Sequence, residues 1–272
     1  MTEDFTNTTA LSPYETVSTS ASLADAVQYR RPSVFSLLRT SQKRKAALSR
    51  IRDIVSAPNF TSSSVVPIVS ACAATLSPPV FSYLLQTPNI QGHTALYWAI
   101  VNDRREAFSA FVVFIPRFSS AGCLDLRLAC MVTNNQALFK QLNLGVNYSP
   151  KDEPLRRSLG CQPDDVQVNE GDGPCHFVAY IRMRIFQKRL RITRSMSIEF
   201  VAWGRIWRLH FYMEESGTWW AVVGLSPHTS SFRLSAPLYC ELVIKSHEKE
   251  PQAKCPTQYV DPQSWDGLGY PG

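Results

Sequence analysis

Short apolar runs at helical spacing alternate with polar turns between residues 64 and 144. Each of three similar units has the pattern of an apolar helix, a polar turn and a second apolar helix. The predicted helix pairs are 66–74 with 80–85, 95–101 with 106–114, and 126–131 with 137–142. One such unit cannot bury its apolar face alone, so the pattern predicts a stacked helical repeat array.

The second and third units align on their large and small apolar positions. Leu96 and Ala99 match Leu126 and Ala129 at a shift of 30 residues. A small residue recurs where two stacked helices approach closely. We therefore expect these four side chains to share one apolar seam. At a shift of 28, the matching residues of the first unit are Ile68 and Ala71.

Residues 89–99 resemble an ankyrin repeat, whose pattern is Asp/Asn-x-x-Gly-x-Thr-Pro-Leu-His-x-Ala. The matching residues are Asn89, Gly92, Thr94, Leu96 and Ala99. Alanine stands at the family's proline and tyrosine at its histidine. The resemblance implies that Gly92 lies in a β-turn and that Thr94 caps the next helix. The spacing of 28–30 residues is shorter than the family's length of about 33, so a generic helical repeat is the alternative.

From His176 onward, β-branched and aromatic residues alternate with polar ones, which predicts antiparallel strands. The predicted strands are 177–186, 190–200, 207–212, 218–225 and 238–245, with a hairpin at 214–217. The runs Trp207–Tyr212, Trp219–Leu225 and Tyr239–Ile244 resemble part of a MATH (TRAF-like) β-sandwich, which implies a peptide-binding domain. The predicted fold class is α+β in two segments, with an ankyrin-like helical repeat array followed by an antiparallel β-sandwich-like domain.

Composition divides the chain further. The predicted parts are a disordered leader at 1–26, the helical repeat domain at 27–146, a linker or long loop at 147–174, the β domain at 175–247 and a flexible tail at 248–272. A short repeat array leaves its end faces uncovered. We therefore expect a helix at 34–57 to cover one end and the β domain to cover the other.

The net charge of +6 is distributed unevenly. Segments 30–52 and 182–208 each hold eight Lys or Arg residues, the first with no acid and the second with only Glu199. Six acids lie between them, in 152–172. Such a distribution attracts nucleic acid or anionic lipid, although a solvated charged surface has the same composition. The alternative function is therefore nucleic-acid or chromatin-associated binding through these two segments.

Motifs for catalysis and cofactor binding are missing from the sequence. It has no Gly-x-Ser-x-Gly, no phosphate-binding loop and no Gly-x-Gly-x-x-Gly, so we expect neither an enzyme nor a cofactor. Cys161, Cys175 and His176 are a conceivable metal-binding set, but adjacent residues on a strand point to opposite faces. Free thiols are the alternative. With no signal peptide, no Cys-x-x-Cys and no membrane span, we expect a protein of the cytoplasm or nucleus.

The leading hypothesis is a non-catalytic scaffold or adaptor that binds a protein partner with its helix repeats and is itself a monomer. Turns and loop ends present side chains to partners in repeat proteins. The partner-binding candidates are Gln91, His93, Asn102, Asp103, Arg104 and Arg105. In Arg30-Arg31-Pro32-Ser33, the pattern suits a basophilic kinase, which makes Ser33 a phosphorylation candidate.

Overall fold

The computed structural model of the 272-residue chain describes residues 34–58, 64–146, 149–171, 176–227, 242–246, 249–255 and 258–259. The predicted leader 1–26 and the candidate Ser33 lie outside these residues. The chain divides into two compact units, Met1–Arg39 and Thr40–Gly272. In the first unit, the described residues are the beginning of helix α1. In the second, the helices and the strands belong to one unit.

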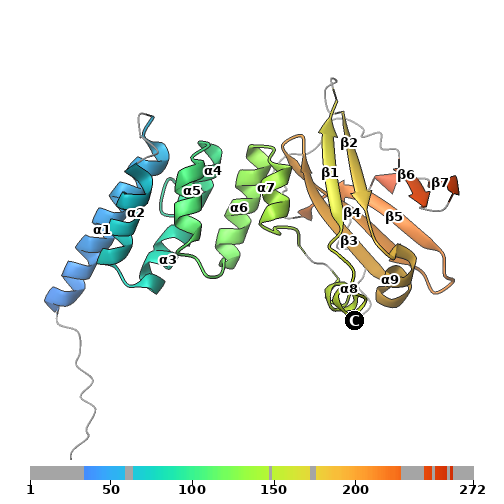
Figure 1. The fold of residues 1–272 in the computed structure, drawn as a ribbon, viewed down its shortest axis with the longest axis horizontal. Coiled ribbons are helices and arrows are strands. Elements are labelled where there is room, and N and C mark those ends of the chain that lie inside the picture. Colours follow the sequence, from blue (N-terminus) through green and yellow to red (C-terminus); the bar gives the residue numbers. More distant parts are fainter. Residues whose placement is uncertain are drawn as a thin grey trace, which may run out of the picture. The chain divides into compact units, whose positions relative to one another are not determined.

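Helices in the order predicted form the first half of the described structure (Figure 1). Their bounds are α1 Val34–Ser56, α2 Val65–Thr75, α3 Pro78–Gln86, α4 Ala95–Val101, α5 Arg105–Val112, α6 Ser120–Val132 and α7 Gln136–Gln141. The three predicted helix pairs are therefore confirmed, as α2 with α3, α4 with α5, and α6 with α7.

Side-chain caps define where three of these helices begin. The Thr94 hydroxyl accepts a hydrogen bond from the Tyr97 amide at 3.1 Å, which confirms the cap expected for α4. Ser119 accepts from the Gly122 amide at 3.0 Å in α6. Each bond satisfies an amide that has no partner within its helix. In α7, the Asn135 side chain accepts a hydrogen bond from the Leu138 amide at 2.9 Å.

The predicted seam between the second and third pairs is present. Leu96, Ala99, Leu126 and Ala129 are each at most 1% exposed and belong to one apolar cluster, and α4 packs against α6. In the first pair, the predicted register is wrong. Ala71 is exposed, while Val69 and Cys72 are buried. One residue along a helix is a rotation of about 100°. Since α2 packs against α5 rather than against the α4 seam, it turns a different face inward.

The core of the helix pairs extends into both predicted caps. Ile51, Ile54 and Val55 of α1 belong to the same cluster, and so do Val201 and Ile206 of the sheet. The helical and β regions therefore share apolar contacts and do not behave as separate packing units.

The main sheet has the strand order β3-β4-β5-β8, with β3 Ser195–Ala202, β4 Arg205–Met213 and β5 Trp219–Leu225 antiparallel. Strand β8, Gln258–Tyr259, runs parallel to β5. A separate hairpin is formed by β1 Asp165–Glu170 and β2 Phe177–Arg182, and another by β6 Leu242–Ser246 and β7 Lys249–Cys255. The predicted α+β class is confirmed. The predicted hairpin at 214–217 is also present, with Gly217 at a φ of +85°.

A second apolar cluster covers one face of the main sheet. Alternate residues of β4, namely Trp207, Leu209 and Phe211, pack there with Leu190 of helix α9, Phe186–Thr193. The hairpin β1–β2 contributes Val166. The period-2 pattern of β4 thus places its apolar side chains on this face, as the alternation in the sequence predicts.

Two segments differ from the prediction in secondary structure. The strand predicted at 190–200 begins only at Ser195, because residues 186–193 form helix α9. Phe186, Leu190 and Thr193 are four and three residues apart and face inward together, which is helical spacing. The strand predicted at 177–186 ends at Arg182.

Intervals predicted to lack regular structure contain some. The interval 147–174 holds helix α8, Asp152–Ser158, and strand β1, and the interval 248–272 holds β7 and β8. These strands are short and polar, so their own residues give a weak strand signal. Strands β1 and β7 pair with neighbouring strands in hairpins, whereas β8 pairs with β5, more than 30 residues earlier. In the predicted strand 238–245, residues 238–241 lie outside the described part. Residues 242–246 pair with β7 and not with the main sheet.

Candidate interaction surfaces

The first predicted binding turn contains one exposed side chain and one that holds the helix pairs together. Gln91 and Gly92 have positive φ angles of 50° and 82°, which make the expected turn, and Gln91 is exposed. His93 Nδ1 lies 2.7 Å from Asp125 Oδ1 of α6, and its ring stacks on Tyr97 with centroids 3.8 Å apart. His93 therefore joins the second pair to the third.

Asp125 is a structural residue that the sequence analysis missed. It is 9% exposed, and its Oδ2 accepts a hydrogen bond from the Thr94 amide at 2.6 Å. The carboxylate thus satisfies the beginning of α4 from the neighbouring pair. Burial, and after it the Asp125 charge, raises the pKa of the Tyr97 hydroxyl. An acid at an interior position of an apolar helix was the available signal for such a role.

The second predicted turn has two structural and two exposed residues. Asn102 Nδ2 donates to the Val55 carbonyl at 2.7 Å, and Arg104 Nη2 donates to the Ala57 carbonyl at 2.6 Å. Both side chains therefore satisfy carbonyls at the C-terminal end of α1, which have no partner within that helix. Asp103 and Arg105 are exposed and form an ion pair of 3.0 Å at the surface.

An apolar groove of about 510 Å³ lies between α2 and α5. Val66 and Val113 are 59% and 80% exposed beside it, and Phe114 and Ala110 line it. Arg105 and Glu106 supply charge at the groove. The residues that line it are Val66, Val69, Ser70, Arg105, Glu106, Ser109, Ala110, Val113 and Phe114. The structure thus places one predicted binding residue, Arg105, beside exposed apolar side chains.

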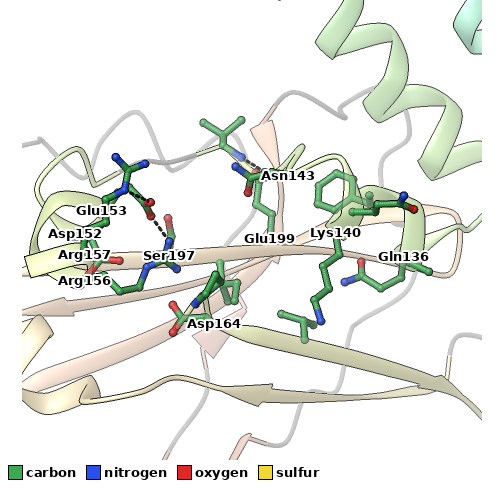
Figure 2. A pocket seen from close by; sticks show the side chains of 18 residues that line it. Gln136, Lys140, Asn143, Asp152, Glu153, Arg156, Arg157, Asp164, Ser197 and Glu199 are labelled. Atoms are coloured by element: carbon green, nitrogen blue, oxygen red, sulfur yellow. Dashed lines mark hydrogen bonds and ion pairs between the residues drawn. The ribbon is translucent and has the colours of Figure 1, made fainter. Parts of the chain in front are cut away.

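A larger, polar cleft of about 740 Å³ lies among α7, α8, β1 and β3. Figure 2 shows Glu153 near Arg156 and Arg157 on one side of the cleft and Lys140 on the other side. Glu153 pairs with Arg156 and with Arg157, and Glu199 accepts a hydrogen bond from the Val146 amide at 2.8 Å. The two ion pairs of Glu153 lie within α8, whereas the Glu199 bond links β3 to the residues after α7.

A buried ion pair anchors α6 to the sheet beside this cleft. Arg127 Nη1 lies 2.8 Å from Glu199 Oε2, and Arg127 Nη2 donates to the Ser226 hydroxyl at 3.1 Å. Ser226 in turn donates to Glu199 Oε1 at 2.6 Å. Arg127 also donates to the Leu144 carbonyl. One guanidinium therefore joins α6, the residues after α7, β3 and the end of β5.

The edge strand β3 and the turn after it donate two further bonds, to the first residue of α7 and to the turn before α7. Gln136 Oε1 accepts from the Val201 amide at 2.7 Å, and Asn134 Oδ1 accepts from the Gly204 amide at 3.2 Å. An edge strand otherwise presents unpaired amides to other chains. The third helix pair thus covers part of the edge of the main sheet.

Arg189 is completely buried between two carboxylates. Its guanidinium makes two hydrogen bonds to Asp152 of 2.6 and 2.8 Å, and two to Asp164 of 2.7 and 2.8 Å. Burial alone would lower the pKa of Arg189, but the two carboxylates raise it above its ordinary value. The clamp links α8, the residues before β1 and α9.

Neither a metal-binding cluster nor a membrane-spanning helix occurs among the described residues. No group of three or more His, Cys, Asp or Glu side chains there is arranged to hold a metal ion, and Cys175 of the conceivable set lies outside them. None of the described helices is long and apolar enough to cross a membrane. Comparisons with protein-family models, with curated proteins and with solved structures found no match.

Proposed function

We propose that this chain is a non-catalytic scaffold or adaptor of the cytoplasm or nucleus that binds a protein partner through its helix pairs. The observation that carries the proposal is the apolar groove between α2 and α5, with Val66 and Val113 exposed beside it. An exposed apolar surface with charges at its border is typical of protein interaction sites. The partner in this proposal inserts apolar side chains between α2 and α5 and pairs with Arg105.

We also propose an ankyrin-like relationship for the helix pairs. Its support is local: Gly92 adopts a positive φ in the turn, and Thr94 caps α4. The packing of α2 against α5 departs from a regular stack, in which equivalent helices pack on one another. The support for the MATH-like proposal is the hairpin-connected pair of strands β4 and β5. Strand β6 pairs with β7 and not with the main sheet, which counts against this proposal.

The partner proposal is tested by reversing the chemistry of the groove in the full-length chain. Val113→Asp and Val66→Asp place a carboxylate at exposed positions, so the fold is expected to persist. The matched control is Leu124→Asp, at a 52% exposed apolar position of α6 that does not line the groove. Bait protein is incubated with cell extract, and bound proteins are quantified by mass spectrometry.

The proposal expects a set of proteins bound by the original chain and by Leu124→Asp but lost with both valine variants. Thermal melting of each variant checks that the fold is retained. Equal recovery by the valine variants would rule out the groove, and recovery of no specific protein by the original chain would count against the adaptor function.

Nucleic-acid binding is the second candidate, and exposed cations on α1 favour it. Arg39, Lys43, Arg44, Lys45, Arg50 and Arg52 are exposed there. In segment 182–208, by contrast, Arg189 and Arg208 are buried, which removes them from any surface contact. The test is the salt dependence of affinity for unrelated DNA and RNA, because neutralised phosphates make binding fall steeply with salt. Weak binding without such a slope would exclude this candidate.

A further inference from the structure

Isoleucine and cationic side chains on helix α9 and at its ends are exposed to solvent. Its inner face consists of Arg189, Leu190 and Thr193, which are buried. Ile185, just before the helix, is 48% exposed, and Ile192 is 53% exposed. The exposed cations on the helix and its flanks are Arg182, Arg184, Lys188, Arg191 and Arg194. Arg194 lies next to the acidic hairpin, since its Nη1 donates to the Glu214 carbonyl at 3.4 Å.

Three of these side chains lie on one side of the helix. Within α9, Lys188 lies three residues before Arg191 and four before Ile192, so the three are neighbours on the helix surface. Arg184 and Ile185 are also exposed and lie in the turn that leads into the helix. We call Arg184, Ile185, Lys188, Arg191 and Ile192 the α9 face. It holds three cations and two isoleucines.

Ile185 has a backbone conformation that its side chain disfavours. Its φ and ψ of 51° and 36° lie in the left-handed region, where a β-branched residue is a rare outlier. The buried Arg189 holds this backbone, with its amide donating to the Ile185 carbonyl at 3.0 Å and Nη1 donating to the Arg184 carbonyl at 3.2 Å. Burial of the side chain does not compensate for the strain, because about half of it stays exposed. Backbone strain that the surrounding structure enforces, at a side chain that stays half exposed, is typical of a functional position.

We propose that the α9 face docks on an anionic lipid surface. Isoleucines at an interface enter the boundary between headgroups and acyl chains, while lysine and arginine remain at the level of the phosphates. The α9 face carries both elements, and the Arg189 clamp makes it rigid before contact. A nucleic-acid surface would favour exposed aromatic rings for stacking. The aromatic residue of α9, Phe186, instead packs against Phe211 and Trp219.

The first test measures binding of the full-length chain to vesicles. Phosphatidylcholine vesicles are compared with vesicles that contain about 30% phosphatidylserine, at low and high salt. We expect binding to the anionic vesicles that falls with salt. Each cation removed in Lys188→Gln and Arg191→Gln should lower the partition coefficient about five-fold, and Ile192→Ser about ten-fold. The matched controls are Arg117→Gln and Val132→Ser, at exposed positions of the helix pairs.

The second test separates docking from a structural role of the same residues. Asparagine tolerates the left-handed region better than isoleucine, so Ile185→Asn relieves the strain. We expect this variant to raise Tm by about 2–4 °C and to bind anionic vesicles more weakly. A residue with only a structural role would not show stability and binding changing in opposite directions.

Three results would overturn the proposal. In the first, the original chain does not bind anionic vesicles. In the second, the α9 variants bind these vesicles as strongly as the control variants do. In the third, the original chain binds a polyglutamate peptide or DNA as strongly as lipid, and Ile192→Ser has no effect on vesicle binding. That result would show that charge alone acts and that no lipid surface is preferred.

Discussion

Arg127 of α6 and Glu199 of β3 form a buried ion pair, with Nη1 and Oε2 2.8 Å apart and side chains 5% and 0% exposed. Residues 72 positions apart in the sequence thus meet where the helix pairs join the sheet. The Ser226 hydroxyl binds both partners, and the Val146 amide binds Glu199. This junction couples the helix pairs to the sheet, because removal of either charge leaves the other buried without its counter-ion.

Removal of one partner of this pair should destabilise the whole unit. Arg127→Met leaves the Glu199 carboxylate buried without its cation, so we expect a loss of about 3–5 kcal/mol in the free energy of unfolding. The double variant Arg127→Met/Glu199→Leu should recover part of the loss, since no buried charge remains. Urea unfolding measures both. A single-variant loss below about 1 kcal/mol, a value typical of exposed pairs, would contradict the role assigned to this pair.

Loss of Asp125 should weaken the contact between the second and third helix pairs. Asp125→Ala removes the bonds to His93 and to the Thr94 amide, and we expect a loss of about 2–3 kcal/mol. The control, Asp103→Asn, removes an exposed ion pair with Arg105 at a φ of 48° that asparagine tolerates, and should change stability by less than about 0.5 kcal/mol. Thermal and urea unfolding of the two variants decide the matter, and equal losses would refute the assignment.

His210 should make the stability depend on pH. Burial, and after it the neighbouring Arg208, lowers the pKa of His210 to about 4. In the unfolded chain, the pKa of a histidine is about 6.5. Between about pH 6.5 and about pH 4, His210 is therefore protonated in the unfolded chain but neutral in the folded one. Stability should therefore fall as the pH drops through that interval, by up to about 1.4 kcal/mol per pH unit.

The control for this pH dependence is His210→Gln, which keeps a polar side chain but does not titrate. As the pH falls, the original protein should lose more unfolding free energy than His210→Gln. The carboxylates titrate equally in both proteins, so the extra loss comes from His210. Parallel curves between about pH 4 and about pH 6.5 would show that His210 does not contribute.

Thiol reactivity should follow burial. Burial raises the pKa of Cys130 to about 12, although the nearby Arg127 charge lowers it, and burial also raises the pKa of Cys72. Both thiols should react with maleimide only after unfolding, because the thiolate is the nucleophile. Half-buried Cys161 should react in the native protein. Peptide mass spectrometry after brief labelling at neutral pH measures each site, and rapid native labelling of Cys130 would contradict its burial.

Local pattern was sufficient where one helix decides the outcome. Thr94 caps α4 because its hydroxyl lies three residues before the amide that it accepts from, a relation within the sequence. The apolar spacing of Leu96 and Ala99 likewise predicts which side of α4 is buried. For α2, the same reasoning selected Ala71 instead of Cys72, because the inward side depends on which helix packs against it.

The candidate residues show the same limit. Asn102 and Arg104 were predicted to face a partner. In the structure, their side chains donate hydrogen bonds to the carbonyls of Val55 and Ala57, each 47 residues earlier in the sequence. The ends of α9 were predicted as parts of two strands, 177–186 and 190–200, because β-branched and aromatic residues suit strands. The helical form of α9 depends on the pocket for Leu190 under the sheet and on the carboxylates that bind Arg189. Neither feature is visible in the eight residues themselves.

The sequence by itself determined the α+β class, the order of helix pairs before strands, the caps and the apolar seam of α4 and α6. These features depend on periodicity and on contacts between residues a few positions apart, and both can be read from the sequence. Only the tertiary structure decided that Arg127 meets Glu199, that α2 faces α5, that Asn102 and Arg104 bind α1, and that α9 shows isoleucines to the solvent. Those outcomes depend on which surfaces approach one another in three dimensions, and burial and hydrogen bonding are satisfied only once they do.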